Sequence, residues 1–251
     1  MPAVCLYLQL HQPFRLRKYT AFDSDAGYFD AKANAAIVRR VAERCYVPML
    51  RLLHERVLGL GGRFRFAISI TGMLVEQLEV NAPEALHILH TLAATGQVEF
   101  LGETYAHSLA ALRSPAEFIE QVNLHREMLK RLFSVVPTTF RNTELIYSNE
   151  IARQAAGLGF SVILAEGWEA VLNNRSAAFL YRAGGAAAGA GAPGMAILLR
   201  NHELSDAITF RLTDVRSPEF PLTEKSFARK IAGIGGQFCN LFMDGETFGE
   251  H

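Results

Sequence analysis

The sequence has no excess of charge of either sign and is poor in cysteine and tryptophan. Its 251 residues include 25 basic and 25 acidic side chains, so the formal net charge is zero. Because no basic face is obvious, nucleic acid is not expected as a partner. The three cysteines, Cys5, Cys45 and Cys239, lie far apart in apolar contexts and match no metal-binding spacing. They are predicted to be core thiols in a reducing compartment.

Long hydrophobic runs and targeting signals are also lacking. No apolar run is long enough to span a bilayer, so no membrane association is expected. The N-terminus has no basic start followed by a long apolar stretch and a small-residue cleavage site. These features predict a cytoplasmic protein. Half of the residues are apolar, which is enough for a substantial core, and the sequence leaves the oligomeric state open.

Two common catalytic motifs do not occur. Residues 183–194 are rich in alanine and glycine, but they lack the lysine and the serine or threonine of a phosphate-binding loop. This segment is predicted to be a flexible surface loop. There is no Gly-x-Ser-x-Gly sequence, so an α/β-hydrolase triad is not expected.

Seven apolar segments with strand character alternate with helical patterns or loops. They lie at residues 3–10, 63–70, 97–101, 137–141, 160–164, 196–200 and 237–243. This alternation predicts an α/β fold with a mostly parallel sheet. Polar residues follow several of these strands and would have to converge, which favours closure into a barrel over an open sheet.

Helices are predicted between most of these strands. The expected ranges are 32–58 with an interruption near Pro48, 72–78, 82–95, 115–133, 148–158 and 222–231. Asn81 is predicted to cap the third of these helices, and Ser114 with Glu117 forms a capping box for the fourth. Residues 14–31 are predicted to be a loop, and residues 204–212 are ambiguous.

Two acidic residues at strand ends could act as a catalytic pair. Glu144 follows the strand at 137–141, and Asp244 comes directly after the strand at 237–243. Two carboxylates on either side of a sugar can share glycosidic cleavage, one attacking the anomeric carbon and the other protonating the leaving oxygen. Each acid could instead cap the helix that follows its strand.

Other candidate residues have equally open interpretations. His11 ends the first strand and is either a hydrogen-bonded rim residue or a donor to a sugar hydroxyl. Trp168 follows the fifth strand and could be a sugar-stacking platform or rim packing. Glu99, Glu103 and His107 are four residues apart, a spacing that suits metal ligands on a helix. The run Val-Glu-Phe-Leu and its flanking glycines argue against a helix there, so no metal site is predicted.

Four segments in order resemble signature regions of glycoside hydrolase family 57, which comprises α-amylases, 4-α-glucanotransferases, branching enzymes and related enzymes. They are His11-Gln12-Pro13, Gly96 to Phe100, Phe140 to Leu145 and Met243 to Gly249. His-Gln-Pro alone is a weak signal, whereas all four in order at strand ends form a specific pattern. The resemblance covers the whole chain and is greatest to the branch described as α-amylase-like.

The resemblance implies an incomplete seven-stranded (β/α) barrel that acts on α-glucans or maltooligosaccharides by a retaining mechanism. By this resemblance Glu144 is the nucleophile and Asp244 the acid/base. The residues implied to line the sugar subsite next to the scissile bond are His11, Glu99 and Glu246, and Trp168 is added as a substrate-binding candidate. No metal or cofactor is implied.

Two departures from the family pattern affect these expectations. The third segment has Arg141-Asn142-Thr143 before Glu144 in place of the common tryptophan and proline, so substrate specificity does not transfer. The sequence also stops at His251, without the fifth signature region or the family's C-terminal helical region. We therefore expect residues 1–251 to be a truncated catalytic barrel domain with exposed apolar surface, reduced stability and weak or no activity.

Several functions remain open from the sequence. The leading one is a retaining hydrolase of α-1,4 linkages in α-glucans. The same residues could serve a 4-α-glucanotransferase or branching enzyme, because hydrolysis and transfer share one glycosyl-enzyme. A glucan-binding remnant without catalysis is a second class. A metal-dependent hydrolase that uses His11, His107 and a carboxylate is a third.

Overall fold

The seven predicted strands all form in the computed structural model, which describes residues 1–184, 194–212, 214–217 and 220–250. They are β1 (Ala3–Leu10), β2 (Phe66–Ile70), β3 (Val98–Phe100), β4 (Thr139–Arg141), β5 (Val162–Glu166), β7 (Ala196–Arg200) and β8 (Phe238–Asp244). An unpredicted two-residue strand, β6 (Tyr181–Arg182), pairs with β7 in the antiparallel direction. Most of the predicted alanine-glycine loop, residues 185–193, lies outside the described residues.

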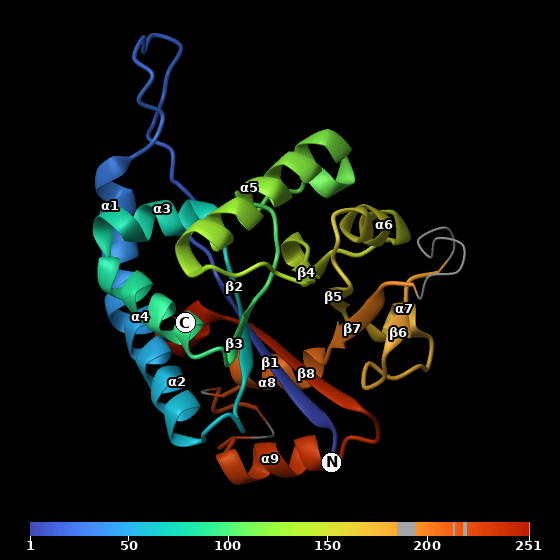
Figure 1. The fold of residues 1–251 in the computed structure, drawn as a ribbon. Helices are drawn as coiled ribbons and strands as arrows, with labels where there is room; N and C mark the ends of the chain where they lie inside the picture. The colour runs from blue at the N-terminus through green and yellow to red at the C-terminus, as the bar shows by residue number, and fades with distance from the viewer. Residues whose placement is uncertain (185–193, 213, 218–219, 251) are drawn as a thin grey trace.

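The strands form two four-stranded sheets that together enclose one interior. Their orders are β3-β2-β1-β8 and β4-β5-β7-β6, and every pair except β6–β7 is parallel. A parallel bridge between Gly102 and Phe140 connects the sheets on one side. On the other side, the backbone N–H of Asn201 donates to the carbonyl oxygen of Asn240 at 2.8 Å. This confirms the α/β fold with an incomplete seven-stranded barrel of mostly parallel strands (Figure 1).

The long helical segment after the first strand contains a π-helical turn. Helix α1 (Ala31–Val41) continues through the π-helical residues Ala42–Tyr46 into α2 (Val47–Gly59). The predicted interruption near Pro48 takes the form of this π-helical turn, and the proline itself lies in the first turn of α2. The wider turn just before it supplies the departure from α geometry that a proline requires.

The remaining helices lie between the other strands. They are α3 (Gly72–Asn81), α4 (Pro83–Ala94), α5 (Pro115–Phe133), α6 (Asn149–Gly157), α7 (Glu169–Leu172), α8 (His202–Thr209) and α9 (Glu224–Ala232). Ser114 caps α5 as predicted. Asn81 does not cap α4 but ends α3, and Ala82 takes the capping position. Among the described helices, none is long and apolar enough to cross a membrane.

The strands carry apolar side chains on both faces, so one apolar cluster lies between the strands and the helices and another lies inside the barrel. The largest cluster packs helices α1 to α4 against the outer face of β1 and β2, including Leu8 and Leu10 (Figure 1). Because side chains alternate along a strand, Tyr7 and Gln9 point to the other face, into the barrel. Tyr7 packs there with residues from β5 and β8, among them Leu164 and Phe242. Gln9 lies one layer higher, towards the carboxyl ends of the strands.

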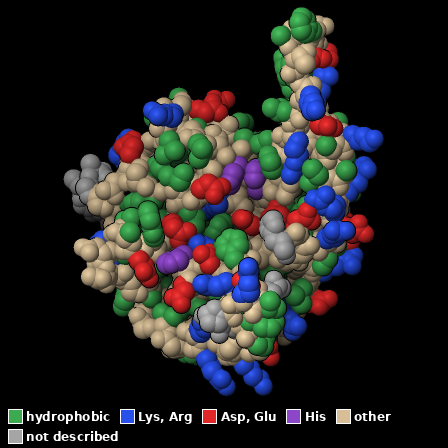
Figure 2. Space-filling view, turned by 180° about the vertical axis from the view of Figure 1, so that it is seen from behind, with side chains coloured by type: hydrophobic (Ala, Val, Ile, Leu, Met, Phe, Trp, Pro, Cys, Tyr) green, Lys and Arg blue, Asp and Glu red, His purple; other side chains and the backbone are tan. Residues whose placement is uncertain are grey.

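The predicted loop after the first strand is an arm that projects from the barrel (Figures 1 and 2). A single antiparallel bridge between Leu16 and Phe29 and an ion pair between Arg17 and Asp25 hold its two branches together. Phe22 at its tip is almost fully exposed. The arm begins at the carboxyl end of β1, where the chain leaves the barrel.

The close contact between the two sheets at Gly102 can be tested by adding a methyl group. A Cβ atom at Gly102 would lie 2.4 Å from the ring of Phe160. We therefore expect Gly102→Ala to lower the free energy of unfolding by about 1–3 kcal/mol, as overpacked cores do. Urea denaturation measures this change.

The matched control is Gly157→Ala, at the end of α6, where an added Cβ meets nothing within 4 Å. Because alanine restricts the unfolded chain more than glycine does, this variant should gain about 0.4–1 kcal/mol of stability. Equal effects of the two substitutions would contradict the tight contact at the sheet junction.

Candidate active site

The carboxyl ends of the parallel strands surround a pocket of about 570 Å³. Its lining contains five acidic side chains and two arginines. Figure 2 shows histidine and acidic side chains gathered on one face of the molecule. The polar residues at the strand ends are Gln9, His11, Arg141, Glu144, Glu166, Arg200, Asp244 and Glu246. Convergence of strand-end side chains is what a parallel barrel produces.

The strand register places Asp244 beside the centre of this pocket. Gln9 in β1 is the register partner of Ser69 in β2 and of Asp244 in β8. Register partners point to the same face of a sheet. Gln9 and Ser69 both donate hydrogen bonds inside the barrel, to the carboxylate of Glu103. Asp244 therefore belongs to the same inward-facing row.

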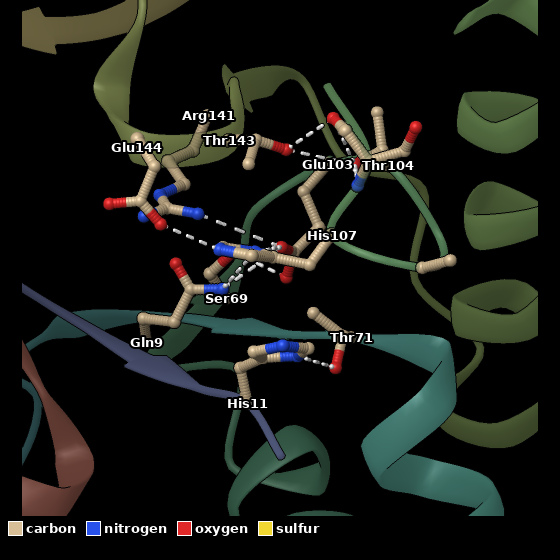
Figure 3. A network of polar contacts seen from close by, with 12 residues as sticks. Gln9, His11, Ser69, Thr71, Glu103, Thr104, His107, Arg141, Thr143 and Glu144 are labelled. Atoms are coloured by element: carbon tan, nitrogen blue, oxygen red, sulfur yellow. Dashed lines mark hydrogen bonds and ion pairs between the residues drawn. The ribbon is translucent and has the colours of Figure 1, made fainter. Parts of the chain in front are cut away.

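Glu103 is a fully buried carboxylate that follows β3. Nε2 of Gln9 donates to its Oε2 at 3.1 Å, and Oγ of Ser69 donates to its Oε1 at 2.6 Å (Figure 3). Burial alone would raise the pKa of Glu103. The hydrogen bonds from His107 and Ser69 and the positive charge of Arg141 oppose burial, and the pKa of Glu103 lies below its usual value. Glu103 is therefore ionised at neutral pH.

His107 connects Glu103 with the candidate nucleophile Glu144. Its Nε2 donates to Oε1 of Glu144 at 2.8 Å (Figure 3). Burial would lower the pKa of His107, but the hydrogen bonds to Glu103 and Glu144 raise it above 6.5. In return, this hydrogen bond lowers the pKa of Glu144, and the charge of Arg141 acts in the same direction. An exposed carboxylate is thus kept ionised and oriented at the edge of the pocket.

Both residues of this pair have a left-handed backbone conformation. The φ angles of His107 and Glu144 are 55° and 54°. Non-glycine residues adopt this conformation at a cost of roughly 1–3 kcal/mol and are concentrated at functional sites. Here the conformation brings two loops, one after β3 and one after β4, into contact through their side chains.

His11 stacks on His107, with ring centroids 4.3 Å apart. Burial, assisted by the positive charge of His107, lowers the pKa of His11 to about 4. Its Nδ1 lies 2.9 Å from Oγ1 of Thr71, which already accepts from the backbone N–H of Leu74. Because a hydroxyl has one proton and two lone pairs, Thr71 can donate to Nδ1 or accept from Nδ1–H, and both tautomers of the neutral ring fit this contact. His11 is thus a neutral imidazole held through Nδ1.

Glu246 lies in a second buried polar group beside Asp244. Its Oε1 accepts from Nε2 of Gln12 at 3.0 Å and from the hydroxyl of Tyr46 in the π-helical turn. Burial raises the pKa of Glu246 despite these two hydrogen bonds. Arg15 at the base of the arm donates to Oε1 of Gln12. This chain of contacts ties the loop after β8 to the end of β1.

The structure brings together four of the six residues singled out from the sequence. His11, Glu144, Asp244 and Glu246 all line the pocket. Glu99 does not: it is paired with Ala67, beside Tyr7, one layer below Gln9. It faces a separate cavity of about 350 Å³ at the amino-terminal ends of the strands.

Trp168 also lies outside the pocket lining. It precedes the short helix α7 and is 63% exposed. At the preceding residue, Gly167, the chain passes close to β7, because an added Cβ would lie 2.1 Å from the carbonyl oxygen of Arg200.

The polar residues that support the candidate pair have no clear signal in the sequence. The spacing of Glu103 and His107 is one that suits metal ligands, and Arg141 stands out only as a departure from a motif. Their position in the sequence is the one available indication, since Glu103 comes shortly after the end of β3, just as Glu144 comes shortly after the end of β4. In the described part of the chain, no group of three or more His, Cys, Asp or Glu residues is arranged to hold a metal ion.

Fold and pocket together define the class: a parallel (β/α) barrel with an acid-rich pocket at the carboxyl ends of its strands. The sequence profile of glycosyl hydrolase family 57 matches residues 5–251. The chain belongs to this family.

Individual relatives agree with this membership. The chain is 41% identical over 250 residues to a Methanocaldococcus jannaschii protein named "Putative alpha-amylase", covering 97% of the chain and 51% of the relative. The chain thus spans about half the length of that relative.

Solved structures share the fold at low sequence identity. The 4-alpha-glucanotransferase from Thermococcus litoralis superposes with a TM-score of 0.72 at 17% identity, covering 99% of this chain and 34% of the other. The branching enzyme from Pyrococcus horikoshii gives a TM-score of 0.67 at 16% identity, with coverages of 99% and 64%.

The opposite pKa shifts of the stacked histidines can be measured by NMR titration. We expect His11 to titrate near pH 4 and His107 above pH 6.5. Since the folded pKa of His107 is the higher one, its protonation stabilises the fold below about pH 6.5 and this contribution is lost as pH rises through the folded pKa. His11→Gln and His107→Gln assign the two signals.

Glu144→Gln provides the control for the cause of the shift. Replacing the carboxylate by an amide removes a contact that favours the imidazolium, so the pKa of His107 should fall. An unchanged titration of His107 in this variant would argue against the hydrogen bond to Glu144.

Proposed function

We propose that this chain carries the catalytic centre of a retaining glycoside hydrolase that cleaves α-1,4 linkages in α-glucans. The observation that carries the proposal is the contact between His107 and Glu144, which keeps an exposed carboxylate ionised in a pocket shared with Asp244. Membership of glycosyl hydrolase family 57 supports the reaction class. The cytoplasmic location expected from the sequence stays a prediction.

In the first step, Glu144 is the nucleophile. One of its carboxylate oxygens forms a bond to the anomeric carbon while the bond from that carbon to the glycosidic oxygen breaks. Asp244 gives its proton to the departing oxygen. The neutral His11 ring, held through Nδ1, offers Nε2 to a sugar hydroxyl, and Arg141 stabilises the negative charge on the carboxylates around it.

In the second step, Asp244 acts as a base. It takes a proton from water, the water oxygen attacks the anomeric carbon, and the bond to Glu144 breaks. The sugar keeps its original configuration after two inversions. If a sugar hydroxyl replaces water, the same step transfers the glycosyl group, which is the reaction of a 4-α-glucanotransferase or branching enzyme.

The test of the proposed pair is substitution by the isosteric amides. Glu144→Gln and Asp244→Asn should each lower kcat on maltooligosaccharides by at least about a thousandfold, because an amide is neither a nucleophile nor a proton donor of suitable acidity. The rate is measured as reducing ends released. Proton NMR of the first product should show the α-anomer.

Glu169→Gln serves as the control, since this exposed acid at the start of α7 lies outside the pocket lining. It should retain the rate of the unchanged chain. Near-normal rates after either pocket substitution would reject the assignment. Binding of maltooligosaccharide with no product from the unchanged chain would favour a glucan-binding protein without catalysis.

A further inference from the structure

A second polar wall of the pocket is organised by Arg200 at the end of β7. Its Nε donates to the carbonyl oxygen of Phe242 at 3.2 Å. Its Nη1 donates to Glu166 at 3.1 Å, and its Nη2 donates to Asp206 at 2.5 Å. All three guanidinium nitrogens are engaged, so Arg200 fixes the two carboxylates against the strand that carries Asp244.

The strand order places this wall on one side of the candidate pair. Going around the barrel from β4 to β8, the chain presents Glu144, then Glu166 at the end of β5, then Arg200 at the end of β7, and then Asp244. Gln9 in β1 and His11 directly after it lie on the other side of β8. A glycosidic bond held between Glu144 and Asp244 would therefore have polar side chains on both sides, from β1 on one side and from β5 and β7 on the other.

The charge and shape of the second wall suit a neutral sugar. Glu166 and Asp206 are partly exposed, with 40% and 35% of their side chains accessible. Carboxylate oxygens accept hydrogen bonds from hydroxyl groups, whereas five acids facing two arginines disfavour an anionic ligand. Phe210 follows α8, is 70% exposed and also lines the pocket, so it offers an apolar ring to the C–H face of a sugar.

Buried polar atoms in the same pocket point independently to a polar ligand. Gln9 and Arg141 line the pocket and are each only 2% exposed. Oε1 of Gln9 and both Nε and Nη1 of Arg141 have no hydrogen-bond partner within the described part of the chain. Figure 3 shows that Gln9, Arg141 and Glu144 point toward one another from separate elements. Buried polar groups without partners are rare, and a ligand is one way to satisfy them.

We propose that Glu166, Asp206 and Phe210 form the subsite for the sugar that departs in the first step and for an acceptor sugar in the second. This inference rests on the proposed function. In transfer, an acceptor hydroxyl gives its proton to Asp244, its oxygen bonds to the anomeric carbon, and the bond to Glu144 breaks. The subsite takes neutral glucose units and sets the balance between transfer and hydrolysis.

The test uses the 251-residue chain with α-maltosyl fluoride as donor and maltose as acceptor. Fluoride is released as the glycosyl-enzyme forms, and the products then report whether water or maltose arrives. The ratio of transfer product to free maltose released from the donor should fall about tenfold in Glu166→Gln and Asp206→Asn, as expected for loss of a hydrogen bond to a charged group. An unchanged ratio in both variants would overturn the subsite.

Glu203→Gln is the matched control, because Glu203 lies on the same helix as Asp206 but outside this pocket. Its product ratio should equal that of the unchanged chain. Glucose should act as an acceptor and glucose 6-phosphate should not. Equal transfer to both sugars would contradict the preference for a neutral ligand.

Failure of the proposed function can be separated from failure of the subsite. If the unchanged chain releases no fluoride, residues 1–251 are inactive, as expected for a truncated barrel domain, and calorimetry with maltose then decides the subsite by itself. Binding that weakens about tenfold in Asp206→Asn, with no change in Glu203→Gln, supports the subsite. Absence of maltose binding, or equal binding in both variants, rejects it.

Discussion

The buried carboxylate of Glu103 must be surrounded by hydrogen-bond donors and positive charge, because isolating an ion in a protein interior costs roughly several kcal/mol. Its partners come from four strand ends: Gln9 from β1, Ser69 from β2, His107 after β3 and Arg141 from β4. One buried charge thus ties half of the barrel rim together. Since His107 and Arg141 also act on Glu144, the position and ionisation of the candidate nucleophile depend on the same buried group.

The two stacked histidines have pKa values shifted in opposite directions by their surroundings. His11 lies against Thr71 at the start of α3 and stays neutral, because burial and, to a smaller extent, the charge of His107 lower its pKa. His107 lies between two carboxylates, and its hydrogen bonds to them raise its pKa. Each protonation state follows from neighbours on different strands. A pair of titrating groups with pKa values driven apart is a recurrent arrangement in enzymes that exchange protons.

The positions of the strands could be predicted from the sequence far better than the level along the barrel axis at which each side chain lies. All seven parallel strands could be found, because each is a short apolar run between glycines or helical patterns, whereas the two-residue β6 has no such signal. The family resemblance implies that Glu99 lines the sugar subsite, but the residue faces the cavity at the amino-terminal ends of the strands. That depends on the register with β2, which is a property of two strands together.

Contacts between strands could not be predicted either. Glu166 and Arg200 are 34 positions apart in the sequence, and His107 and Glu144 are 37 apart. Neither contact follows from a local pattern. Each needs the strand order before its members can be recognised as neighbours.

The π-helical turn at residues 42–46 is equivalent to one extra residue inserted into a continuous helix. The extra residue rotates the side chains of α2 about the helix axis relative to those of α1. In the turn itself, Tyr46 donates a hydrogen bond to Glu246, and the thiol of Cys45 donates to the carbonyl oxygen of Gly245. Deleting one residue there would restore regular geometry and rotate all of α2 by about 100° relative to α1. The length of this segment is therefore constrained more tightly than its composition, and homologous chains should tolerate substitutions there more readily than deletions.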